Sequence, residues 1–108
     1  MTIDKFDEFL EQVLMEVKRV LSSKSEDYST HLDKLYNFKL AARIAGVSYE
    51  EALRGMQLKH QASIAQGLDE LKEGKVRELS WWEEKIIDNI NYLLFCFYFI
   101  ACRCGESN

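Results

Sequence analysis

Residues 80–103 read SWWEEKIIDNINYLLFCFYFIACR, and this stretch decides the fold. Ser80 is followed three residues later by Glu83, the pattern of a capping box, which predicts that a helix begins here. This helix is expected to run to about Arg103. Its second half, residues 93–102, is apolar throughout (LLFCFYFIAC), which predicts a helix buried on several sides.

The apolar run at 93–102 has too few residues to cross a bilayer, since a spanning helix needs about 20. Extending it backwards meets Asn91, Asn89 and Asp88, which a lipid-facing helix would avoid. The run is nevertheless more apolar than one face of a monomeric bundle requires. We therefore expect the protein to form a homo-oligomer.

Three further helices are expected upstream, at about 4–23, at about 31–45 and from Ser48 to near Gly74. In each, apolar residues recur at intervals of three and four, which marks one helical stripe. The polar segment SSKSED is expected to end the first, and Gly46 suits the left-handed end of the second. Ser48 and Glu51 form another capping box. The sequence predicts an all-α, antiparallel four-helix bundle, a single domain over residues 1–108 with a flexible tail at about 104–108.

Composition narrows the classes of function. The chain has 108 residues, and its five glycines and lack of proline argue against a loop-rich or all-β protein. Its formal net charge is −4, so we expect no broad cationic surface for duplex nucleic acid or a membrane. The start, MTIDKFDEFL, does not resemble a signal peptide, and we expect a cytoplasmic location. The three cysteines lie near one end of the chain, a pattern that favours reduced thiols over a disulfide framework.

The expected fourth helix carries polar residues where a bundle should be apolar. Glu84, Asp88 and Asn91 are four and three residues apart, so they share one face, with Tyr92 beside them. Buried carboxylates need a cation, a metal or hydrogen-bond donors as partners. Alternatively, the first two turns are solvated and the acids act as capping and dipole residues, although Asp88 lies more than one turn inside the helix.

Other segments offer partners for these acids. The candidates are Lys24, Asp27 and Tyr28 after the first helix, Asn37 on the second, and Lys59 and His60 on the third. Each also has a structural explanation, because a histidine on an apolar stripe is commonly a satisfied core residue and Asn37 can anchor a bundle by hydrogen bonding. Taken together, they would supply the cations, amides and carboxylates of a small polar pocket.

The order of these residues resembles a known group of proteins. Lys24-Ser-Glu-Asp27-Tyr28, then Asn37-Phe38-Lys39, Lys59-His60 and Glu84-Lys85-Ile-Ile-Asp88-Asn-Ile-Asn91-Tyr92-Leu93, are similar to small phage and prophage proteins associated with nucleotide metabolism or modification. That group resembles a distant branch of the all-α NTP pyrophosphatases, the MazG-like and dimeric dUTPase superfamily.

The resemblance implies a nucleotide ligand and a magnesium-dependent pyrophosphohydrolase. Glu84 and Asp88 would be the catalytic magnesium ligands, Lys24 or Lys59 would neutralise phosphate charge, and Tyr28 or Trp81 would stack on a base. The sequence departs from the superfamily in two places. The second helix offers only Asp33 in place of an acid pair, and Lys85 stands where an acid is expected, leaving Glu84 one position off.

Two alternatives follow from these departures. A site with too few carboxylates would bind a nucleotide without hydrolysing it, as in a phage anti-defence protein that sequesters a cyclic nucleotide signal through Lys24, Lys59, His60 and Tyr28. The other alternative is a purely structural helical oligomer, whose aromatic fourth helix serves only as an interface.

Overall fold

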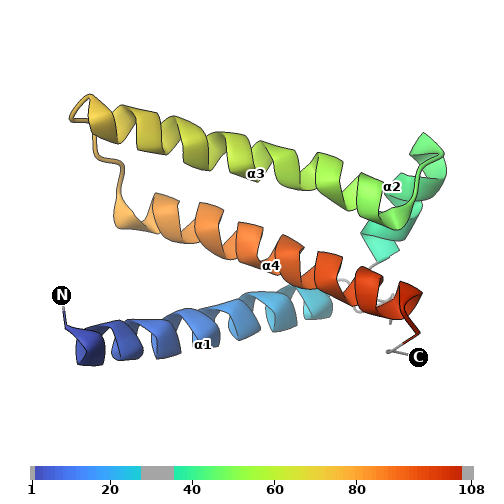
Figure 1. The fold of residues 1–108 in the computed structure, drawn as a ribbon, viewed down its shortest axis with the longest axis horizontal. Coiled ribbons are helices and arrows are strands. Elements are labelled where there is room, and N and C mark those ends of the chain that lie inside the picture. The colour runs from blue at the N-terminus through green and yellow to red at the C-terminus, as the bar shows by residue number, and fades with distance from the viewer. Residues whose placement is uncertain (1, 28–35, 106–108) are drawn as a thin grey trace. The chain divides into compact units, whose positions relative to one another are not determined.

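A computed structural model describes residues 2–27 and 36–105, with the side chains of residues 22–27 left out of the description. The described residues form four helices and no strand: α1 (Ile3–Asp27), α2 (Tyr36–Ala45), α3 (Tyr49–Lys72) and α4 (Leu79–Arg103) (Figure 1). The predicted all-α class with four helices is confirmed. The predicted oligomeric state and the flexible tail stay predictions, and residues 106–108 of that tail lie outside the described residues.

The chain divides into two compact units, residues 1–34 and residues 35–108, and each is described by itself. The first unit contains α1, whose first turn is capped by Thr2 Oγ1, which accepts a hydrogen bond from the Lys5 amide at 3.2 Å. The prediction that SSKSED ends this helix near Ser23 is wrong, because α1 continues to Asp27. Serine, lysine and glutamate are all compatible with a solvated helix, so the loss of apolar residues did not mark a helix end.

In the second unit, α2 and α3 meet at a tight turn that was predicted correctly. Gly46 ends α2 with a positive φ of 70°, a conformation that favours glycine. Ser48 then caps α3, its Oγ accepting a hydrogen bond from the Glu51 amide at 3.2 Å. The described part of α2 begins at Tyr36, and the predicted first turns at 31–35 lie outside the described residues.

The turn between α3 and α4 differs from the prediction. Gly74, with a φ of 85°, follows α3 as expected, but α4 begins at Leu79 and its N-cap is Glu78, which makes no side-chain capping bond. The Glu78 carbonyl already accepts a hydrogen bond from the Trp81 amide at 3.0 Å. Ser80 therefore lies inside the helix, and the predicted capping box from Ser80 to Glu83 is wrong.

Helices α3 and α4 run antiparallel (Figure 1). Near the connection between them, a glycine of α3 lies against two indole rings of α4. Gly67 is buried, and a Cβ atom there would lie 2.8 Å from ring atoms of both Trp81 and Trp82. The Arg77 guanidinium lies 4.3 Å from the centre of the Trp81 ring and donates two hydrogen bonds to the Glu70 carboxylate, at 2.7 and 2.9 Å. Gly67 thus takes the core position at this end, and the adjacent Leu68 is exposed.

The core of the second unit lies at the other end, around α2. Phe38, Leu53 and Phe99 are buried together, and the partly buried side chains of Met56, Tyr92, Phe95 and Cys96 pack against them. The Phe38 ring lies 5.2–6.2 Å from the rings of Tyr92, Phe95 and Phe99, in tilted and edge-on contacts. Glu50 and Arg103 form a bidentate ion pair across this end.

Midway along α3 and α4, two amide side chains meet. The Gln57 Nε2 donates a hydrogen bond to Asn89 Oδ1 at 2.7 Å, and Gln57 is buried. By length and mean hydropathy alone, α4 is long and apolar enough to cross a membrane, a test that core helices of globular proteins also pass. The predicted cytoplasmic location stays a prediction.

Candidate functional site

A groove in the second unit lies where α2, α3 and one residue of α4 come together. Its volume is about 530 Å³, within the range of small-molecule sites. Much of its surface comes from small side chains, which leave room where larger ones would fill it: Ala41 and Ala45 of α2, Ala52 and Gly55 of α3. Val47, Glu51, Met56, Lys59, His60 and Tyr92 complete the lining.

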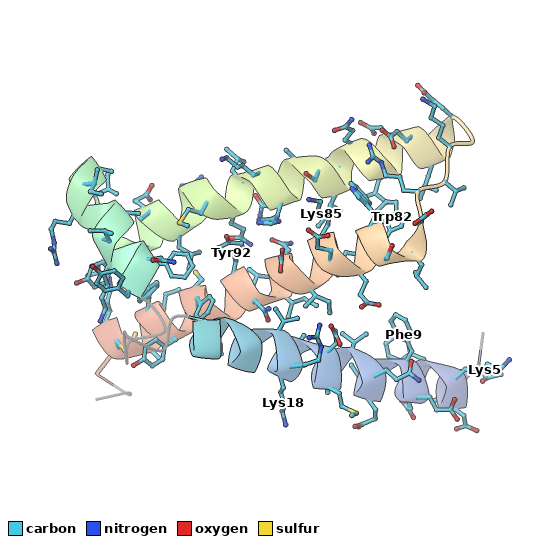
Figure 2. All side chains as sticks on the ribbon, turned by 180° about the vertical axis from the view of Figure 1, so that it is seen from behind. Lys5, Phe9, Lys18, Trp82, Lys85 and Tyr92 are labelled. Atoms are coloured by element: carbon cyan, nitrogen blue, oxygen red, sulfur yellow. The ribbon has the colours of Figure 1, made fainter. Side chains whose placement is uncertain are left out.

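Lys59, His60 and Tyr92 were all predicted site residues, and the groove brings the three together. Tyr92 reaches it from α4, with its side chain on the edge of that helix that faces α3 (Figure 2). The Tyr92 and His60 rings lie 5.1 Å apart at 41°. Within the part of the chain that the structure describes, Lys59 forms no ion pair, so its ammonium is available to an anion in the groove.

His60 also faces Asp88, the acid expected to lie deepest in the fourth helix. The His60 Nδ1 and Asp88 Oδ2 atoms are 4.0 Å apart, close enough for electrostatic attraction and too far for a hydrogen bond. The His60 Nδ1 atom is buried and has no hydrogen-bond partner among the residues that the structure describes. A buried polar atom left in this state costs free energy, and a ligand or water that bonded to it would recover that cost.

Glu84 lies one turn before Asp88 on the same helix and is exposed. Among the described residues, no three histidine, cysteine or acidic side chains gather closely enough to hold a metal ion. Magnesium is commonly held by one or two carboxylates together with phosphate oxygens and water. Neither Glu84 nor Asp88 lines the groove, so their predicted role as Mg²⁺ ligands stays a prediction.

The remaining predicted site residues fall outside the groove or outside the description. Asn91 is buried, and within the described ranges 2–27 and 36–105 neither polar atom of its amide has a hydrogen-bond partner. Asn37 is exposed on α2 and does not line the groove. Tyr28 and the side chains of Lys24 and Asp27 lie outside the described residues. Their roles stay predictions.

Two features of the site were not anticipated from the sequence. The first is the groove's set of small residues, which could have been found from Ala41 and Ala45, four apart on α2, opposite Ala52 and Gly55, three apart on α3. The second is the packing of Trp81, which was suggested as a base-stacking residue. The Trp81 ring packs on Trp82 and lies under the Arg77 guanidinium.

Comparison with known proteins adds no assignment: the chain matches no family model, no curated protein and no solved structure.

Proposed function

We propose that the groove between α2 and α3 binds a nucleotide. The observation that carries the proposal is the meeting, in one groove of about 530 Å³, of the His60 and Tyr92 rings with Lys59, which forms no ion pair among the described residues. The resemblance of the sequence to small phage proteins associated with nucleotide metabolism supports the same class of ligand.

The chemistry of the groove suits the two halves of a nucleotide. The small apolar side chains of Ala41, Ala45 and Ala52 offer a surface for a flat base, because apolar area removed from water favours binding. Lys59 offers a compact positive charge to phosphate oxygens. The His60 ring lines the groove beside the Tyr92 ring and adds to the surface on which a base would lie.

The finer proposal is a magnesium-dependent nucleoside triphosphate pyrophosphohydrolase. In it, Glu84 and Asp88 would hold Mg²⁺ against the phosphates, and the bound ion would supply charge neutralisation and an activated water. Asp88 Oδ2 also lies 4.0 Å from His60 Nδ1, so the proposed metal ligand and the groove histidine are neighbours.

Binding without hydrolysis is the second candidate, and a specific observation favours it. The described residues supply two carboxylates one turn apart, and one of them, Glu84, is exposed. A sequestering protein needs only the groove, Lys59 and the stacking surface, and would retain a linear or cyclic nucleotide unchanged. A purely structural helical oligomer, the remaining alternative, would bind no nucleotide.

The test is a panel of NTPs, dNTPs and cyclic dinucleotides, measured by calorimetry and by chromatography of the products, with Mg²⁺ and with EDTA. Lys59→Ala is expected to weaken binding about tenfold or more, the loss of one charge-assisted contact. Lys72→Ala is the matched control, because Lys72 lies in the last turn of α3 and does not line the groove. Equal effects of the two substitutions, or no bound nucleotide at all, would refute the groove as the site.

Asp88→Asn separates the two candidates. Loss of turnover with nucleotide binding retained would identify the pyrophosphohydrolase, whereas unchanged nucleotide recovered from both proteins, with or without EDTA, would identify a sequestering protein. Turnover that survives Asp88→Asn would exclude Asp88 as the catalytic metal ligand.

A further inference from the structure

Helix α3 contains two glycines, and packing explains the presence of one of them. Glycine is among the least favourable residues inside a helix, so each position needs a reason. Gly67 has one, because the Trp81 and Trp82 rings occupy the space where its side chain would lie. At Gly55 a Cβ atom would meet nothing within 4 Å, so no contact among the described residues requires glycine there.

Gly55 instead lines the groove, in a row with two charged residues. Glu51, Gly55 and Lys59 are spaced four residues apart on α3, and all three line the groove. Residues four apart lie on the same side of a helix, about 6 Å from each other along its axis. The row is therefore about 12 Å long, with a carboxylate at one end, bare backbone in the middle and an ammonium at the other end.

This row deepens the proposal of a nucleotide site and rests on it. We propose that the groove selects a guanine nucleotide, whose base lies against the α3 backbone at Gly55 and donates hydrogen bonds to the Glu51 carboxylate. The missing side chain lets a flat ring approach the helix closely. With its phosphate at Lys59, an extended nucleotide of similar length to the row places the far edge of its base at Glu51.

The chemistry of a carboxylate favours guanine over the other bases. An ionised carboxylate only accepts hydrogen bonds, and it can accept two at once. Guanine presents two adjacent donors, its N1–H and its 2-amino group, which suit the two carboxylate oxygens. Adenine and cytosine place a ring-nitrogen acceptor beside their amino group, and uracil flanks its N–H with carbonyl oxygens. Each of these bases would therefore set a lone pair against the Glu51 carboxylate.

The contacts of Glu51 leave its carboxylate accessible to such an edge. The Glu51 Oε1 atom lies 3.9 Å from Arg54 Nη1, beyond hydrogen-bond distance, and both side chains are largely exposed. An exposed pair at this separation contributes little, so a base can replace it. The neighbouring acid, Glu50, is held by its ion pair with Arg103 and does not line the groove.

The first experiment measures Kd by calorimetry for GTP, ITP, ATP, CTP and UTP in EDTA, which prevents metal-dependent turnover. These ligands carry the same sugar and phosphates, and ITP lacks only the 2-amino group of GTP. GTP is expected to bind about tenfold or more tightly than ITP, the effect of one charge-assisted hydrogen bond, and more tightly than ATP, CTP or UTP. Equal Kd values, with binding still weakened by Lys59→Ala, would refute the guanine preference and leave the nucleotide site standing. Absence of binding by every nucleotide would refute both.

The role of Glu51 is tested by Glu51→Gln. The glutamine amide can pair with the N1–H and O6 that GTP and ITP share, so the preference for GTP over ITP is expected to fall to about one. The ratio of the two Kd values is compared because removal of a negative charge strengthens the binding of every nucleotide. Asp69→Asn, at an exposed acid of α3 outside the groove, is the control and should keep the wild-type ratio. A preference for GTP that persists in Glu51→Gln would refute Glu51 as the residue that reads the base.

The position of the base is tested by Gly55→Leu. Leucine is a good helix former and its Cβ has room at this position, so helicity in circular dichroism should be retained. Nucleotide binding is expected to weaken about tenfold or more, because the new side chain takes the place of the base. Gly55→Ala should give a smaller loss in the same direction. Ala65→Leu adds the same bulk at an exposed position of α3 outside the groove and should bind nucleotide as the wild type does. Wild-type affinity in both Gly55 variants would refute the contact between the base and Gly55.

Discussion

The contact between Gly67 and the two tryptophans can be tested by comparing the same glycine-to-alanine substitution at two positions of α3. Alanine is a better helix former than glycine, so a glycine-to-alanine change inside a helix ordinarily stabilises a protein by about 0.5–1 kcal/mol. Gly55 and Gly67 both lie within α3, and a Cβ atom at Gly55 would meet nothing within 4 Å. Gly55→Ala should therefore show the full stabilisation.

At Gly67 the same change meets a packed surface. The added Cβ would lie 2.8 Å from atoms of both indole rings, closer than van der Waals contact allows. The Trp81 ring cannot move away freely, because Arg77 stacks on it and is itself held by Glu70. Overpacking of this kind costs about 1–3 kcal/mol, which exceeds the gain in helix propensity. We expect Gly67→Ala to be less stable than Gly55→Ala by about 1–3 kcal/mol.

Urea and thermal unfolding followed by circular dichroism would measure this difference. For a domain of this size, 1 kcal/mol shifts Tm by about 4–8 °C, so the two variants should differ by at least several degrees. Protein concentration must be held equal, since self-association would make Tm depend on it. Equal stabilisation by both substitutions would show that the indole rings do not pack on Gly67, and would refute the described α3–α4 packing.

Two further predictions concern the end of the second unit that holds its core. Leu53 is 1% exposed, so Leu53→Ala should lower the free energy of unfolding by about 2–5 kcal/mol in urea denaturation, while the exposed Leu58→Ala should change it by less than about 0.5 kcal/mol. The Arg103 guanidinium lowers the pKa of the Glu50 carboxyl from 4.5 to about 2. Since the pKa of Glu50 is lower in the folded state, the ion pair contributes fully to the free energy of unfolding above pH 4.5, and this contribution is lost as the pH falls toward 2. Arg103→Ala should therefore lower the free energy of unfolding by about 0.2–1 kcal/mol at neutral pH, as for an exposed pair, and by progressively less between pH 4.5 and pH 2. A deficit that stays constant from pH 7 to pH 2 would contradict the ion pair.

The helices were predictable from the sequence, but some of their ends were not. Gly46 and Ser48 marked a true boundary because a left-handed glycine and a capping hydroxyl act locally. SSKSED predicted a helix end and Ser80 a helix start, and both predictions were wrong. Polar residues are also compatible with a continuing helix, and a serine can lie inside one as well as cap it. Local patterns do not reveal which of several possible starts tertiary packing selects.

The candidate site was predictable in part for a similar reason. His60 stood out as a polar residue on an apolar stripe, Lys59 as its neighbour in sequence and Tyr92 for lying beside the polar face of the fourth helix. All three line one groove. The groove itself arises from the absence of side-chain volume at Ala41, Ala45 and Gly55, and small residues give little signal until the helices that carry them are placed side by side. Asn91 was predicted to face inward and is buried, although no hydrogen-bond partner for its amide is found among the described residues.

The hydrogen bond between Gln57 and Asn89 has a consequence for how the sequence can change over time. An apolar contact between α3 and α4 would tolerate a shift of one helix along the other, whereas this pair is satisfied in a single alignment. Loss of the Asn89 amide would leave the buried Gln57 without this partner, and loss of Gln57 would leave a partly buried Asn89 without it, so the two positions are expected to change together or not at all. Across descendants of this chain, position 57 should thus be inherited jointly with position 89, whatever becomes of the surfaces around them.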